Sequence, residues 1–148
     1  MGSVRDPVAR SALIARVKSL TPASQRLWGR MHLTQMLAHT ADQIRMALGE
    51  VEAEGVRGPF RFAPMRFLLL HVLPWPKAKA KAPHEAFTTP PTELESDRAT
   101  LVGLIERFAA TPPSDLTPTH PLFGTMSARD WDALTHKHLD HHLRQFSA

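Results

Sequence analysis

Four histidines lie within the short C-terminal run 136–142, which reads HKHLDHH. Successive residues of an α-helix are about 100° apart, so His138 and His142 would point from the same face and could bind one metal ion. The spacing also allows His138 to pair with His141, three positions on. His136 would lie on the far side of such a helix and face solvent. The run therefore predicts a helical pair of imidazole ligands, with the second member of the pair left open.

A distant part of the chain offers a third imidazole. His39 lies in the middle of LAHTA, residues 37–41, inside a segment with helical periodicity. At that depth a neighbouring helix could bring it to the C-terminal pair. Three imidazoles leave positions free for water or substrate, which distinguishes a catalytic or binding metal from a closed structural site. Neutral imidazole suits zinc or nickel, and the lack of a carboxylate ligand makes iron less favourable.

The helical face that carries His138 and His142 is otherwise apolar. Its remaining members are Trp131, Leu134 and Phe146, so the imidazoles occupy positions where an amphipathic helix normally has Leu or Ile. Burying a neutral imidazole without partners costs on the order of 1–3 kcal/mol, and a divalent cation would satisfy both rings at once. The alternative interpretation is a slightly rotated helix whose histidines lie at a wet boundary and bind no metal.

Four segments with helical periodicity must position these residues. Apolar spacing and end signals predict helices over about residues 7–20, 31–49, 92–111 and 128–146. Asp6-Pro7 has the chemistry of a helix start, and Ser127-Ala128-Arg129-Asp130 is close to a capping box. No segment of strand length alternates with a period of two, and the chain has no Asn-Gly or Asp-Gly hairpin turn. The prediction is an all-α four-helix bundle formed by a single domain, residues 1–148.

A long Pro-rich crossover, residues 49–92, separates the second of these helices from the third. Its Pro and Gly residues exclude a long helix or strand. Inside it, Pro64–Leu73 predicts a short apolar helix laid against the bundle, whereas the Lys-Ala repeat at 77–82 with Pro83-His84 predicts a mobile, solvated loop. His71 and His84 are expected at the surface.

The composition excludes several classes of protein and of metal site. The 148 residues include no cysteine, which excludes a disulfide framework and every thiolate metal site. The net charge of +4 and the pI near 10.1 suggest nucleic acid, but the basic residues are spread along the chain, without zinc-finger spacing, and this argues against it. No apolar run approaches the length of a membrane span, and the N-terminus has no signal-like apolar stretch. We therefore expect a cytoplasmic protein with no membrane partner.

Several motifs together resemble an uncharacterised branch of the DinB/YfiT-like superfamily. They cover nearly the whole chain and are Trp28-Gly29, QMLAH at 35–39, HPLFG at 120–124, Trp131 and KHLDHHLRQF at 137–146. The resemblance implies a four-helix bundle with one histidine on the second helix and two on the last, holding a divalent metal in a cleft. Carried over to this chain, the ligands are His39, His138 and His142, and His141 is a neighbour of the ligands.

The resemblance also suggests a function. Characterised relatives in that superfamily include metal-dependent transferases and isomerases that use low-molecular-weight thiols such as bacillithiol or mycothiol. We therefore expect a divalent-metal-binding protein, with zinc or nickel as the metal, that acts as a thiol S-transferase or a hydrolase on a small molecule. One alternative is a non-catalytic metal- or ligand-binding bundle that could form a homodimer through an apolar face. Another is a surface-interaction protein that uses the basic Lys-Ala loop.

Other polar residues are candidates for supporting roles. Asp42, Asp140 and Gln145 could orient a ligand or transfer protons, or could be solvated or capping residues. Arg144 could meet an anionic substrate, although its place beyond the apolar stripe favours the surface. His120 could approach the mouth of the site, but a structural role in the HPLFG turn is the favoured interpretation.

Overall fold

The computed structural model describes residues 2–77 and 89–148, and these residues are mostly helical, in keeping with the all-α class. The Lys-Ala repeat and His84 lie outside the described residues, apart from Lys77. Among the described helices, none is both long enough and apolar enough to cross a membrane.

Four helices of 13 to 18 residues make up most of the structure. They are α1 (Pro7–Ser19), α2 (Leu33–Ala47), α4 (Leu94–Ala110) and α5 (Ala128–Gln145). Each lies within a segment predicted to be helical, and the predicted ends differ by up to two residues. The end signals act as expected: Asp6 accepts a hydrogen bond from the Ala9 backbone amide, and Ser127 with Asp130 forms a capping box.

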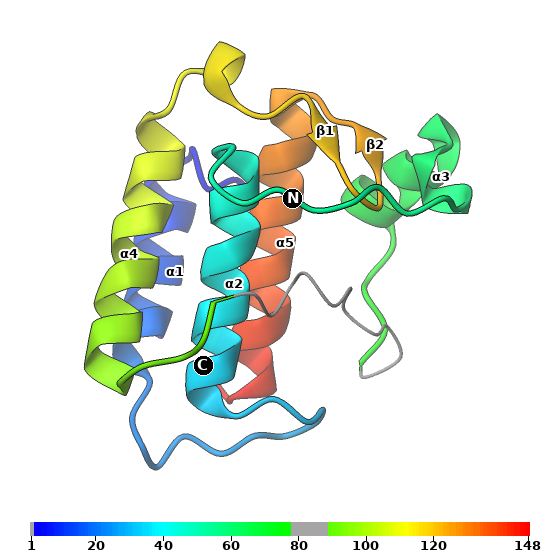
Figure 1. Ribbon diagram of the computed structural model, residues 1–148. Coiled ribbons are helices and arrows are strands. Elements are labelled where there is room, and N and C mark those ends of the chain that lie inside the picture. The colour runs from blue at the N-terminus through cyan, green and yellow to red at the C-terminus, as the bar shows by residue number, and fades with distance from the viewer. Residues whose placement is uncertain (1, 78–88) are drawn as a thin grey trace.

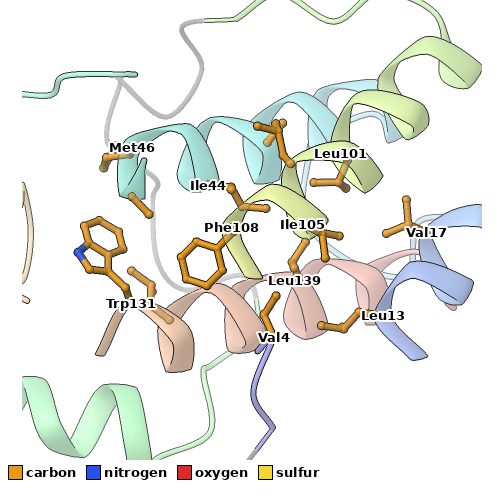
Figure 2. Packing of buried hydrophobic residues seen from close by; sticks show 14 of the residues in the cluster. Val4, Leu13, Val17, Ile44, Met46, Leu101, Ile105, Phe108, Trp131 and Leu139 are labelled. Atoms are coloured by element: carbon orange, nitrogen blue, oxygen red, sulfur yellow. The ribbon is translucent and has the colours of Figure 1, made fainter. Parts of the chain in front are cut away.

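Each of these four helices packs against two of the others. Both α1 and α2 contact α4 on one side and α5 on the other, and Figure 1 shows the four lying side by side. Apolar side chains fill the space between them: in Figure 2, Ile105 and Phe108 of α4 lie beside Ile44 of α2 and Leu139 of α5. This arrangement places the middle of α2 directly against α5.

The crossover contains a second, smaller helical unit beside α5. It comprises the 3₁₀ turn η1 (Pro59–Arg61), the helix α3 (Ala63–Phe67) and the π-helical turn η2 (Leu68–Val72). The short apolar helix predicted at Pro64–Leu73 is therefore present, and η2 contacts α5. In Figure 1 this unit lies on the far side of α5 from α1 and α4.

The expectation that His71 lies at the surface is wrong. Its side chain is only 6% exposed, and Nε2 donates a hydrogen bond to Asp130 Oδ1 over 2.8 Å. Asp130 also caps α5, so this pair fastens η2 to the start of that helix. Sequence spacing could not show the pair because its two members lie 59 residues apart.

The HPLFG motif forms a small hairpin that the sequence patterns did not predict. The two-residue strands β1 (Thr119–His120) and β2 (Gly124–Thr125) pair antiparallel, after the 3₁₀ turn η4 (Pro113–Asp115). They are too short to show a period of two. The turn is closed by His120, whose Nδ1 accepts hydrogen bonds from the backbone amides of Leu122 and Phe123. A positive φ of 71° at Gly124 completes the reversal. His120 therefore has the structural role favoured for it.

We expect His120 to make folding sensitive to acid. Burial lowers the pKa of its imidazole from 6.5 to about 4. Between these values the unfolded chain takes up a proton that the folded protein does not, so the free energy of unfolding decreases as the pH falls from 6.5 towards 4. The full difference amounts to roughly 3 kcal/mol.

The variant His120→Asn isolates this contribution. Asparagine retains a side-chain acceptor for the turn but does not titrate. Urea denaturation of the metal-free protein at several pH values between about 4 and 7 should give a shallower pH dependence for His120→Asn than for the wild type. Equal slopes for the two proteins would show that His120 does not carry the effect.

Candidate metal centre

Three histidines from two helices meet between α2 and α5. His39 comes from α2, whereas His138 and His142 lie one turn apart on α5. Nε2 of His138 is 2.9 Å from Nε2 of His39, and the three ring centroids are separated by 4.7, 4.8 and 4.6 Å. One nitrogen atom from each ring lies within 4.8 Å of the other two. We call these three residues the histidine cluster.

The histidine cluster is buried, and the surroundings of His138 and His142 favour their neutral forms. The exposed fractions of His39, His138 and His142 are 6%, 8% and 8%. Burial lowers the pKa of His138 well below its usual value of 6.5, and the neighbouring rings of His142 and His39 lower it further. Burial also lowers the pKa of His142 to about 3, with a smaller contribution from His39 and an opposing one from the Gln145 hydrogen bond. At neutral pH both rings are therefore in the form that binds metal ions.

Hydrogen bonding within the protein leaves part of the histidine cluster unsatisfied. Nδ1 of His138 is buried and has no hydrogen-bond partner among the described residues. Its Nε2 faces the imidazole nitrogen of His39. Such a ring costs folding free energy on the order of 1–3 kcal/mol unless something else compensates it. On the other side of the ring, the close approach of the two Nε2 atoms suits a shared cation, since a tetrahedral zinc ion holds its nitrogen ligands roughly 3.3 Å apart.

His142 is oriented by a chain of hydrogen bonds. Its Nδ1 donates to Gln145 Oε1 over 3.0 Å, which leaves Nε2 without a proton and free to act as a ligand. The amide of Gln145 in turn donates from Nε2 to the carbonyl oxygen of Trp28 over 2.7 Å. The backbone carbonyl of Gln145 accepts from the Leu27 amide. Gln145, one of the supporting residues considered from sequence, thus contacts the histidine cluster through a hydrogen bond to His142.

Aromatic rings border the histidine cluster near α5. Trp75 lies 6.0 Å from the His138 ring and 5.9 Å from the His141 ring, and Trp28 lies 6.0 Å from His141. His141 is half-buried between these two tryptophans and is outside the group that could share a metal ion. Sequence reasoning gave Trp75 no role; an isolated tryptophan between Pro74 and Pro76 was the available signal.

A hollow reaches the histidine cluster from the α2 side. It has a volume of about 80 Å³ and is lined by Gln35, Ala38, His39, Thr89, Pro90 and Pro91. A second hollow of about 150 Å³ shares Ala38, Thr89 and Pro90 with it. Asp42, one turn after His39, accepts hydrogen bonds from Thr89 and forms an ion pair with Arg45. It thereby fastens the wall of the hollow to α2.

Three other residues considered from sequence lie outside the histidine cluster. Asp140 forms ion pairs with Arg16 and with Arg144, and Arg144 is exposed, as favoured. The expectation that His136 faces solvent is wrong: the residue is half-buried, and its ring lies directly against Gly2. The N-terminal segment covers it, through the hydrogen bonds of Ser3 and Val4 to Asp132. Helical spacing alone could not reveal this cover.

Comparison with known proteins gives a family but no characterised relative. A family model described as "Protein of unknown function (DUF1569)" matches residues 8–148. Curated proteins and solved structures gave no match.

Proposed function

We propose that this chain, which belongs to the DUF1569 family of proteins of unknown function, binds a divalent metal ion through His39, His138 and His142. The observation that carries the proposal is the meeting of three buried imidazoles, two of them with a pKa lowered far enough to be neutral at physiological pH. With imidazole as the ligand and no carboxylate among the three, zinc or nickel is the metal we expect.

We further propose that the site acts on a small molecule, as a hydrolase or a thiol S-transferase. A divalent ion held there would supply Lewis acidity and lower the pKa of a water molecule or thiol that reached it. The residues of the chain orient the ligands and border the site. Gln145 holds the His142 ring in one orientation, and Trp75 lies beside His138. The hollow beside His39 is larger than the roughly 10–15 Å³ that a single water needs, so we assign it to the small ligand.

The contacts of α1, α2, α4 and α5 support a finer proposal about the fold. Because each helix packs against two others in a closed ring, we assign them to a four-helix bundle of the DinB/YfiT-like type. One histidine on the second long helix and two on the last agree with the pattern that the motif resemblance implies.

A non-catalytic metal-binding bundle is the second candidate function. The observation in its favour is that no member of the histidine cluster is more than 8% exposed. The two functions differ in what they require: catalysis needs a coordination position that a small ligand can reach, whereas storage or structural binding needs only the ion.

Elemental analysis tests the metal, and thermal shifts test the ligand. The protein is purified without nickel resin, and its metal content is measured by plasma emission before and after reconstitution with zinc or nickel. A stoichiometric ion supports the proposal, and failure to retain either ion refutes it.

The metal-loaded protein is then screened against low-molecular-weight thiols. A rise in Tm that depends on the metal supports the transferase, whereas no response to any thiol argues against it.

A further inference from the structure

Exposed apolar side chains are concentrated in the crossover unit. Six of the nine large hydrophobic residues that are exposed in the described part of the chain lie within residues 62–73. They are Phe62, Met65, Phe67, Leu68, Val72 and Leu73. We call these six residues the outer face. Apolar patches of this kind on a folded protein mark a surface that contacts another molecule or a membrane.

The outer face is held in place by the opposite side of the same unit. Leu70 is fully buried, and the His71–Asp130 pair joins η2 to α5. Arg66 donates a hydrogen bond to the carbonyl oxygen of Phe123, and Lys137 donates to the carbonyl oxygen of Leu69. The unit therefore has some apolar side chains packed on the protein and others exposed to solvent.

The segment that carries the outer face is basic. Residues 55–77 contain Arg57, Arg61, Arg66 and Lys77 but no Asp or Glu. Arg57 is exposed, whereas the Lys77 ammonium lies over the Trp28 ring, 4.8 Å from its centroid. Arg61 and Arg66 donate to backbone carbonyl oxygens, so no carboxylate neutralises them there. The molecule as a whole also carries a net charge of +4. A surface that is both apolar and cationic complements an anionic lipid interface, whose headgroups attract basic residues while the acyl boundary accepts apolar side chains.

We propose that the outer face binds the surface of anionic membranes. We expected no membrane partner because no segment of the sequence could span a bilayer. Binding at the membrane surface does not need a spanning segment, since a helix lying in the interface needs only an apolar face and flanking basic residues. The proposal is independent of the histidine cluster, so metal-free protein is expected to bind lipid as well as metal-loaded protein does.

Vesicle flotation tests the proposal with the full chain. Vesicles of phosphatidylcholine alone are compared with vesicles of equal parts phosphatidylcholine and phosphatidylserine. We expect binding to the anionic vesicles, little binding to the neutral ones, and release as the salt concentration rises. Absence of binding to the anionic vesicles at low salt overturns the proposal, and so does equal binding to both kinds.

Paired substitutions test whether the outer face is responsible. Phe62→Ser with Val72→Ser, at positions 68% and 56% exposed, should lower partitioning into anionic vesicles about tenfold or more. Arg57→Gln should lower it by a smaller factor and flatten the salt dependence. Val8→Ser, at a position 79% exposed on α1, is the matched control and should not change binding.

The same variants distinguish lipid from a second copy of the chain. Sedimentation equilibrium measures self-association without vesicles. A dimer that dissociates in the Phe62→Ser, Val72→Ser protein, together with lipid binding that this change leaves intact, would assign the outer face to a homodimer interface and overturn the proposal. A wild-type protein that remains monomeric and binds anionic vesicles supports it.

Discussion

The variants His39→Ala, His138→Ala and His142→Ala are each expected to lose the metal ion. A site of three imidazoles has no spare ligand, so each substitution leaves two nitrogens from the protein. If a binding free energy on the order of 10 kcal/mol is shared among the ligands, the loss of one weakens affinity by at least about a hundredfold. Plasma emission after dialysis against metal-free buffer measures the remaining ion, and circular dichroism checks that the metal-free variants are folded.

Two other histidines of α5 serve as matched controls. His141→Ala removes the ring next to His142, and His136→Ala removes the ring that lies against Gly2. Both variants should retain the metal at the wild-type stoichiometry. The comparison between His141→Ala and His142→Ala is the sharpest, because spacing alone allowed either residue to pair with His138. Loss of metal from the first and retention by the second would reverse the assignment.

The parts of the fold that depend on local chemistry could be predicted from the sequence. The start of α1 at Pro7 and of α5 at Ala128 followed from Asp6 and Ser127, whose side chains accept hydrogen bonds from backbone amides three residues on. That His138 would share a face with His141 or His142 followed from the helical period, and the choice of His142 came from the motif resemblance. That His39 would meet them depended on helix packing, and here the motif resemblance supplied what spacing could not.

Contacts between distant segments could not be predicted in this way. The hydrogen bond between His71 and Asp130 joins two elements 59 residues apart, and it decides that His71 is buried. Trp75 reaches His138 only because η2 is fastened to α5. The hairpin at His120 depends on one ring nitrogen that accepts from two backbone amides, a feature without a repeating pattern in the sequence.

We expect Gln145→Leu to weaken metal binding by about 10- to 100-fold while leaving the three ligands in place. Gln145 Oε1 accepts the Nδ1 proton of His142, which fixes the tautomer with its lone pair on Nε2. Leucine fills the same space but cannot accept this proton, so the ring loses its preferred tautomer and orientation. Titration of metal-free protein in competition with a chelating dye measures the change in Kd. Arg144→Leu, at the exposed neighbouring position, is the control and should leave Kd unchanged.

The same hydrogen-bond chain makes Gly29 a remote determinant of metal affinity. Gly29 has a φ of 81°, and a Cβ atom at this position would lie 2.2 Å from Gln145 Nε2. Gly29→Ala should therefore displace the Gln145 amide and weaken binding in the same direction as Gln145→Leu. In the double variant the two effects should not add, because both act through the single hydrogen bond to His142. Additive losses, or a Gln145→Leu protein with the wild-type Kd, would mean that Gln145 supports the helix end and not the ligand.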